Sequence, residues 1–358
     1  MSAIGEQAAL LQHEWRTNPR WAGITRDYGA HDVIRLRGSV AEEHGLARRG
    51  ASRLWGLLHS QDAVPALGAV TGNHALQLVK AGLHAIHLPG RHAADPNLAG
   101  HTDPGQSPHP ASPMTQMVRR VNNALLRTDQ AGQAESSADG TMPAVVADAE
   151  TGAGGAPDAF ELMKAMIEAG AAGVRFEDHL PSDEESGHPG QQVLIPTGQH
   201  IEALTAARLA ADVLGVPALV IARTGARTAS LLTSDIDERD HEFLTGERTA
   251  EGFYRVEPGL YACGTRALAF APYADLLWLE TPAPDLAAAR AFACVIHSQY
   301  PDKLLAYSCS PSFDWREHLD DTTAAGFREE LAAMGYRFQV TTPATVHALD
   351  EPALCLAG

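Results

Sequence analysis

Eight short apolar runs recur along the chain from residue 67 onward, and this recurrence limits the possible folds more than any other feature. Most of the runs end in polar residues or glycine, and most are followed by an alanine-rich pattern typical of a helix. They span residues 67–72, 85–90, 144–150, 173–178, 218–224, 276–281, 304–310 and 337–342. Alternating strands and helices indicate a parallel sheet. Eight such units predict an α/β fold of the (β/α)₈ TIM-barrel type.

The segments between the runs carry the apolar spacing of helices. Residues 159–173 and 201–215 show it clearly, and each closes on glycine, as helix ends often do. Residues 1–60 show helices and turns before any strand, so we expect an N-terminal helical cap followed by a barrel domain over 61–358. Two longer connections, 91–143 and 230–266, are interpreted as lids, interface pieces or mobile segments.

Composition narrows the class of protein further. With 358 residues and 45% hydrophobic residues, the chain can fill one large barrel, and a net charge of −17 disfavours nucleic acids and anionic membranes as partners. The sequence has no uncharged apolar run of about 18 residues, the length needed to cross a bilayer. Its four cysteines show no C-x-x-C spacing, and the start MSAIGEQ is not a signal peptide. We therefore expect a soluble protein in a reduced, cytoplasmic setting.

Charged residues stand at the carboxyl ends of several runs, the face where barrel enzymes place their chemistry. Side chains alternate along a strand, so Asp148 and Glu150 point to the same side, which at a strand end is the barrel mouth. Together with Glu177 and Glu280 they predict a site for Mg²⁺, with Mn²⁺ as the alternative ion. In the competing interpretation these carboxylates are solvated or paired with arginine. The full set expected at this rim is Asp148, Glu150, Glu177, Asp178, Arg223 and Glu280.

Other polar residues at the same rim predict a small-molecule carboxylate as the ligand. Arg223 offers a guanidinium for bidentate binding of a carboxylate, although an ion pair with Glu177 is the alternative role. Three serines spaced by two face one way in an extended chain, and their hydroxyls can hold a carboxylate without adding charge. They are Ser308, Ser310 and Ser312, and Thr342 joins them from the last predicted strand.

Motifs along nearly the whole chain resemble the isocitrate lyase family. They include RWAGITRDYGAHDVIRLRGSV, VVADAETGAGG, GHPGQQVLIPTGQHI, SDIDERD, TGERTAEGFYRV and PDKLLAYSCSPSF, in the family's order. The resemblance implies a magnesium-dependent carbon–carbon lyase that splits isocitrate into glyoxylate and succinate by a retro-aldol step. Related methylisocitrate lyases give pyruvate and succinate. The implied fold is again the (β/α)₈ barrel, and the implied assembly is a homo-oligomer.

The resemblance also implies roles for particular residues. Asp148 would bind the metal, with Glu150 and Glu177 holding metal-bound waters, and Glu280 completes the predicted metal set. The predicted catalytic residues are Ser186, His188, Glu177 and Arg223. The predicted substrate contacts are Gly90, Arg91, Gly187, His188, Arg223, Ser308, Ser310, Ser312 and Thr342.

The loop that carries the family's acid departs from the family pattern. The family signature is Lys-Lys-Cys-Gly-His, and residues 184–188 of this chain read Glu-Glu-Ser-Gly-His. A thiol with a pKa of about 8.5 can donate a proton near neutral pH, whereas the hydroxyl of Ser186 is a much weaker acid. Glu184 and Glu185 would also repel a trianionic substrate.

Two further departures concern the second run and the end of the chain. The family's Ser-Gly-Trp is Pro89-Gly90-Arg91 here. The chain ends at Gly358, before the helices that family members exchange between subunits, which leaves a dimer and a tetramer both open.

Three functional hypotheses follow. The first is a lyase that acts on a less anionic, isocitrate-like 2-hydroxy acid, and the second is an isocitrate lyase of weak activity. The third is a catalytically degenerate homologue that acts as a binding or partner subunit.

Overall fold

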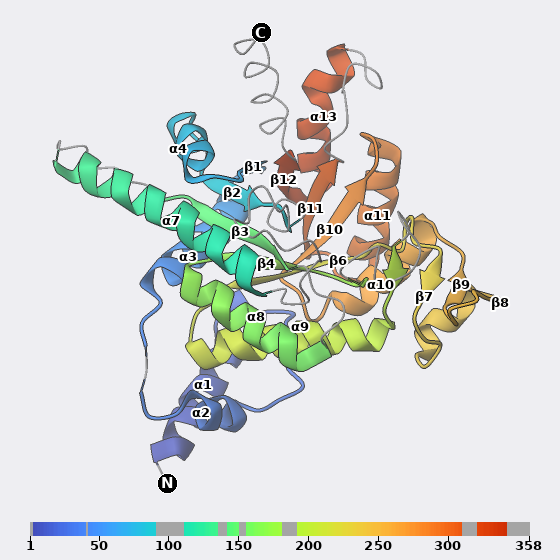
Figure 1. Ribbon diagram of the computed structural model, residues 1–358, viewed down its shortest axis with the longest axis horizontal. Coiled ribbons are helices and arrows are strands. Elements are labelled where there is room, and N and C mark those ends of the chain that lie inside the picture. The colour runs from blue at the N-terminus through green and yellow to red at the C-terminus, as the bar shows by residue number, and fades with distance from the viewer. Residues whose placement is uncertain are drawn as a thin grey trace.

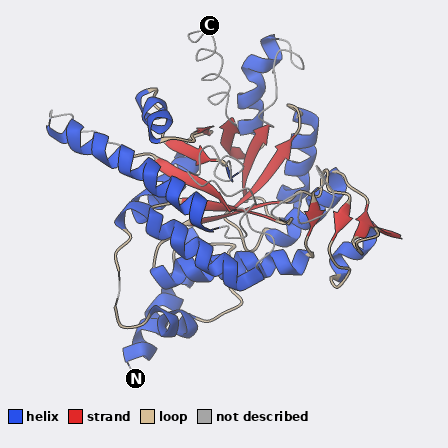
Figure 2. Ribbon diagram, viewed as in Figure 1, coloured by secondary structure: helices blue, strands red, loops and turns tan. Residues whose placement is uncertain are grey.

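Eight parallel strands close into a barrel at the centre of the computed structural model (Figures 1 and 2). The structure describes residues 3–40, 42–90, 111–134, 142–149, 155–180, 192–309 and 321–341. The order of strands around the barrel is β1-β12-β11-β10-β6-β4-β3-β2. Their bounds are Val64–Gly68 (β1), Ala85–Leu88 (β2), Ala144–Ala149 (β3), Gly173–Glu177 (β4), Leu219–Arg223 (β6), Leu276–Thr281 (β10), Leu304–Cys309 (β11) and Tyr336–Thr341 (β12). The predicted barrel is confirmed.

The first strand is the one whose predicted position was wrong by several residues. It was expected at 67–72, whereas β1 ends at Gly68 and the chain turns at Thr71. The Thr71 side chain accepts a hydrogen bond from the backbone N–H of His74 and so caps the next helix, α4 (Gly72–Lys80). A threonine that caps a helix cannot also continue the strand.

Helices cover the outside of the barrel (Figure 2). After α4 they are α7 (Ala111–Ala134), α8 (Gly155–Ala169), α9 (Thr197–Leu214), α10 (Leu260–Phe270), α11 (Leu286–Gln299) and α13 (Asp321–Ala333). The glycine stop predicted at the end of 201–215 is confirmed, because Gly215 follows α9 with a φ of 64°. The stop predicted at Gly173 was three residues late: Gly170 follows α8 with a φ of 98°, and Gly173 begins β4. Such positive φ values favour glycine over other residues.

Two layers of apolar side chains follow from the alternation along each strand. In β3, Val145 and Ala147 face the helices, whereas Val146 faces the barrel interior. The interior layer includes Ile221, Trp278, Ala306 and Phe338. Helix α3 (Gly45–Ser60) adds Ala51, Leu54 and Leu58 to that interior layer and closes the barrel at the amino ends of the strands.

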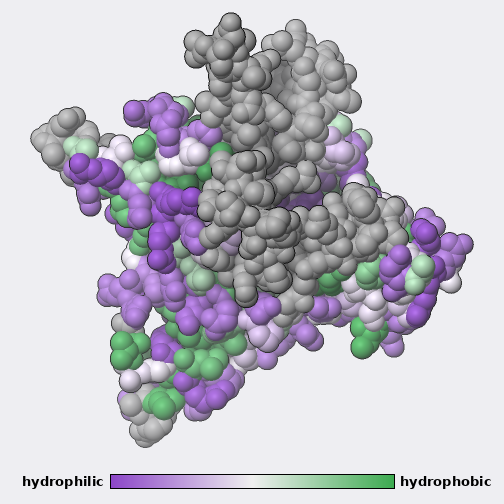
Figure 3. Space-filling model, in the orientation of Figure 1, coloured by the Kyte–Doolittle hydropathy of each residue, from purple (hydrophilic) through white to green (hydrophobic). Residues whose placement is uncertain are grey.

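Three further elements precede β1: α1 (Ala3–Thr17), η1 (Pro19–Trp21) and α2 (Ala30–Arg37). A buried ion pair fastens η1 to the barrel, because Arg20 donates to Asp275 at 2.6 Å and Arg208 of α9 also contacts that carboxylate. Apolar patches interrupt the polar surface over these N-terminal helices at the lower end of Figure 3. Leu10 of α1 and Val40, which follows α2, are exposed.

A small four-stranded sheet in the order β5-β7-β9-β8 projects from the side of the barrel (Figure 1). Its strands are β5 (Val193–Leu194), β7 (Leu231–Leu232), β8 (Leu244–Arg248) and β9 (Tyr254–Val256), with η2 (Glu238–Phe243) between β7 and β8. Most of the connection at 230–266 therefore has a regular structure of its own. Within the described part of the chain, no helix is long and apolar enough to span a membrane.

Candidate active site at the barrel mouth

Polar side chains form the uppermost layer of the barrel interior. In β3 the inward side chain after Val146 is Asp148, and in β10 the one after Trp278 is Glu280. A layer of charged side chains therefore lies directly above a layer of apolar ones. The strand register sets side by side Asp148 with Arg175, Glu177 with Arg223, and Glu280 with Ser308. Period-two alternation and register together assemble the site from residues distant in sequence.

Asp148 is buried, and hydrogen-bond donors surround both of its oxygens. Nε2 of His87 lies 2.8 Å from Oδ1. Oδ2 accepts from the backbone N–H of Gly90 at 3.1 Å and from Nη2 of Arg175 at 2.7 Å. Burial alone would raise the pKa of Asp148, but Arg175 and His87 lower it below its usual value. The side chain is therefore a carboxylate at neutral pH.

Glu177 lies between three cationic groups. Its Oε1 is 2.6 Å from Nη2 of Arg175, and its Oε2 contacts both Nη1 of Arg223 and Nε2 of His179. These partners outweigh burial and hold the pKa of Glu177 well below its ordinary value. Burial would lower the pKa of His179, but the charge of Glu177 raises it.

Arg223 joins Glu177 to Glu280. Its Nη2 donates to Oε1 of Glu280 at 2.8 Å, while Nη1 donates to Glu177. Ser308 donates to the other oxygen of Glu280 at 3.0 Å and accepts from Nε1 of Trp278 at 2.8 Å. The ion pair with Glu177 that the sequence left as the alternative role of Arg223 is thus present. Its Nε, like that of Arg175, is buried without a hydrogen-bond partner among the described residues.

The sequence model of the isocitrate lyase family matches residues 8–248 and 244–354. The chain belongs to the isocitrate lyase family. It is 56% identical over 362 residues to an isocitrate lyase of Mycobacterium tuberculosis, covering 100% of this chain and 85% of the relative. The isocitrate lyase of Escherichia coli is 52% identical over 360 residues, 98% of this chain and 82% of the relative. As a member of this family, the protein is an isocitrate lyase-like carbon–carbon lyase.

Solved structures of more distant proteins share the fold. Oxaloacetate acetylhydrolase with its product oxalate has a TM-score of 0.58 at 19% identity, covering 84% of this chain and 83% of that one. A 2,3-dimethylmalate lyase of the PEP mutase/isocitrate lyase superfamily has a TM-score of 0.56 at 19% identity, with coverages of 86% and 82%. These likenesses confirm the barrel of this isocitrate lyase family member.

The described carboxylates do not present a free set of ligands for a divalent ion. Mg²⁺ prefers oxygen ligands, and Asp148, Glu177 and Glu280 are oxygen donors that face one space. Each of them, however, is already bound by arginine or histidine. Among the residues that the structure describes, no group of three His, Cys, Asp or Glu side chains has an arrangement that could hold a metal. Glu150, the fourth predicted ligand, lies outside them.

Several predicted site residues lie outside the described ranges: Arg91, Glu150, Ser186, Gly187, His188, Ser310, Ser312 and Thr342. Of the others, Asp148, Glu177, Arg223, Glu280 and Ser308 meet at the barrel mouth, and the backbone of Gly90 reaches Asp148.

One expectation about the rim was wrong. Asp178 was grouped with the charged residues of the barrel mouth, but it follows Glu177 and points the other way. It is fully buried and accepts from Nε of Arg266 in α10 at 2.8 Å and from the N–H of Gly225 at 2.8 Å. Alternation along the chain separates Asp178 from its neighbour Glu177.

The sequence interpretation missed His87, Arg175 and His179. Two of them carried a signal, because His87 and Arg175 interrupt otherwise apolar strands two residues before a turn or a carboxylate. A polar residue inside a buried strand needs a partner, and each of these finds one in Asp148.

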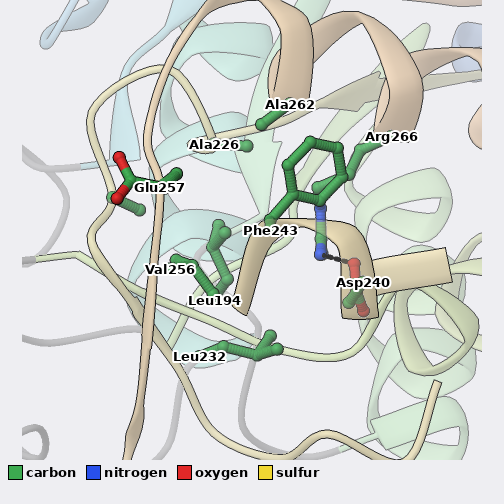
Figure 4. A pocket seen from close by; sticks show the side chains of 10 residues that line it. Leu194, Ala226, Leu232, Asp240, Phe243, Val256, Glu257, Ala262 and Arg266 are labelled. Carbon is green, nitrogen blue, oxygen red and sulfur yellow. Dashed lines mark hydrogen bonds and ion pairs between the residues drawn. The ribbon is translucent and has the colours of Figure 1, made fainter. Parts of the chain in front are cut away.

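A small cavity near Asp178 is not a second candidate site. It lies between the small sheet and α10 and is lined mainly by apolar side chains, including Leu194, Phe243 and Val256 (Figure 4). Its free space of about 10 Å³ holds roughly one water molecule. Arg266, Asp240 and Glu257 are the charged residues that line it, and Arg266 donates to Asp240 at 2.6 Å.

Proposed function

We propose that this protein cleaves a carbon–carbon bond of an isocitrate-like 2-hydroxy acid with two or three carboxylates. The products are a glyoxylate-like 2-oxo acid and a second carboxylate. Family membership supports the lyase class, and the pair of buried guanidinium groups at the barrel mouth supports an anionic substrate. That pair, Arg175 and Arg223, is the observation that carries the proposal.

A retro-aldol cleavage makes three demands on the site. A base takes the hydroxyl proton, cationic groups stabilise the charge that develops on the departing carbanion, and an acid protonates that carbanion. Arg223 and Arg175 are fixed cations in a buried setting, where such stabilisation is strong. Each also has a buried Nε–H without a partner among the described residues.

The remaining parts of the machinery stay predictions. Ser186 and His188 are proposed for proton transfer, with Gly90, Arg91, Gly187, Ser308, Ser310, Ser312 and Thr342 as substrate contacts. The sequence predicted Mg²⁺, with Mn²⁺ as the alternative, at Asp148, Glu150, Glu177 and Glu280. The described members of that set are already bound by arginine or histidine, so the proposed reaction is derived without a metal.

The substrate is proposed to carry less negative charge than isocitrate. Glu184 and Glu185 place two negative charges in the loop that has two lysines in the family pattern. Like charges near a binding site lower both the affinity and the rate of encounter with an anion. A dicarboxylate would suffer less from this repulsion than a tricarboxylate.

The proposal is tested by incubating purified protein with a panel of 2-hydroxy di- and tricarboxylates and trapping the released oxo acid with phenylhydrazine. We expect release from at least one member of the panel. Arg223→Lys keeps the charge but loses the planar fork, and we expect it to lower the rate about 100-fold. Arg290→Lys changes an exposed residue of α11 and serves as the matched control. Release that is equal in all three proteins would contradict the assigned role of Arg223.

A binding or partner subunit without catalysis is the second candidate. The ion pairs within the site favour this candidate, because Glu177 and Glu280 already accept hydrogen bonds from Nη1 and Nη2 of Arg223. Such a protein would bind a dicarboxylate in calorimetry, and Arg223→Lys would weaken that binding, yet no member of the panel would be cleaved.

A further inference from the structure

Arg175 occupies the middle of the carboxylate group at the barrel mouth. It is 7% exposed and rises from the interior side of β4. Its Nη2 lies 2.7 Å from Asp148 and 2.6 Å from Glu177, and its Nη1 lies 3.6 Å from Glu280. One guanidinium therefore reaches all three described carboxylates that were predicted to bind a divalent ion.

The packing around Arg175 holds it in this position. Its guanidinium lies 4.6 Å from the centre of the Trp278 ring, a cation–π contact with strand β10, which is separated from β4 by β6 alone. Strand register places it beside Asp148. Moving Arg175 away would leave the buried carboxylates of Asp148 and Glu177 without this charged partner, which is strongly unfavourable.

The carboxylates of the described centre already have cationic partners. Asp148, Glu177 and Glu280 face the two permanently charged guanidinium groups of Arg175 and Arg223, and Glu177 also contacts His179. A divalent cation added to the two arginines would bring four positive charges against three negative ones in a buried space, or would have to displace an arginine.

We propose that Arg175 is the built-in cation of this centre and stands in the place of a divalent metal. The guanidinium neutralises Asp148 and Glu177, fixes their orientation and keeps Mg²⁺ and Mn²⁺ from binding tightly between them. An arginine is permanently charged and cannot be removed by a chelator. It donates hydrogen bonds but offers no empty orbital, so the centre orients and neutralises an anionic ligand electrostatically.

This inference stands on the contacts of Arg175 and does not depend on the proposed reaction. It is tested by titrating Mn²⁺ into the purified full chain without substrate and following the free-ion signal by electron paramagnetic resonance. We expect the wild-type protein to bind no Mn²⁺ tighter than about 1 mM. Arg175→Gln removes the guanidinium and should bind Mn²⁺ at least tenfold more tightly, because Asp148 and Glu177 lose their shared partner.

Two further variants make the result specific. Adding Asp148→Asn to Arg175→Gln should abolish the gained affinity, which places the ion at this carboxylate. Arg290→Gln removes the same charge from an exposed ion pair on α11 and should leave the affinity as in the wild type. Should Arg175→Gln not fold, Arg175→His takes its place, since imidazole keeps a hydrogen bond to the carboxylates while vacating most of the space.

Two results would overturn the inference. One is submillimolar Mn²⁺ binding by the wild-type protein that Asp148→Asn removes. The other is a folded Arg175 variant that binds Mn²⁺ no more tightly than the wild type. Neither bears on whether the protein is a lyase, because the titration contains no substrate.

Discussion

At the scale of single residues, the protonation of His179 makes the stability of the protein depend on pH. Its Nδ1 lies 2.8 Å from the carbonyl oxygen of Leu180, and its Nε2 contacts the carboxylate of Glu177. Both of these partners are hydrogen-bond acceptors, which favours the imidazolium form of the ring. Burial opposes this charge, but Glu177 outweighs it and raises the pKa of His179.

A stability profile follows from that raised pKa. The pair contributes fully to folding below the histidine's unfolded pKa of about 6.5, and the contribution is lost as pH rises through the higher folded pKa. Urea unfolding at a series of pH values above 6.5 should therefore show a falling free energy of unfolding for the wild type relative to His179→Gln. His59→Gln, a change at the exposed end of α3, is the matched control. Parallel profiles for the wild type and His179→Gln would contradict the imidazolium assignment.

At the scale of elements, one buried arginine ties the barrel to the small sheet. Arg266 of α10 donates to Asp178 at the end of β4, to Asp240 of η2 at 2.6 Å and to the carbonyl of Ile195 at 2.6 Å. Asp240 in turn accepts from the N–H and hydroxyl of Thr197, the first residue of α9. The segment that carries β7, β8 and β9 is thereby fastened to the strand that carries Glu177.

Arg266→Met is expected to loosen this attachment. It leaves Asp178 and Asp240 buried without their charged partner, which costs about 3–5 kcal/mol of stability. Hydrogen exchange should be faster at the amides of β7 and β9 than in the wild type. Arg290→Met breaks an exposed pair with Glu330, worth at most about 1 kcal/mol, and is the control. Equal unfolding free energies for the two variants would show that the network does not fasten the small sheet.

The elements also show what the sequence could predict. Long apolar strands bounded by helices were recognisable because both of their faces are buried. Their charged carboxyl ends predicted that Glu177, Arg223 and Glu280 lie together at the barrel mouth, as they do. Strands β5 and β7 have only two residues each, too few for a periodic signal. Arg175 stands out as a polar residue in an apolar strand, but its partner could not be predicted. That partner depends on the register of β4 with the strand of Asp148, which neither strand shows alone.

At the scale of the whole molecule, the two ends of the barrel interior have different roles: one end is a packed core and the other is the candidate active site. Helix α3 closes the amino end with apolar side chains, and the carboxyl end gathers ionised ones. The same inward alternation produces both layers, so the rigid lower interior positions the charged upper one. The whole chain carries a net charge of −17, yet each of the three described carboxylates of this centre is paired with arginine or histidine.

The most direct measurement of the proposed activity is a carbon balance by proton NMR on purified protein incubated with the 2-hydroxy carboxylates of the panel. Phenylhydrazine reports any oxo acid, including one formed by oxidation, whereas NMR counts both fragments. Our account predicts that at least one substrate disappears while a 2-oxo acid and a second carboxylate appear in equal amounts. Binding of these acids with no fragment formed from any of them would contradict it.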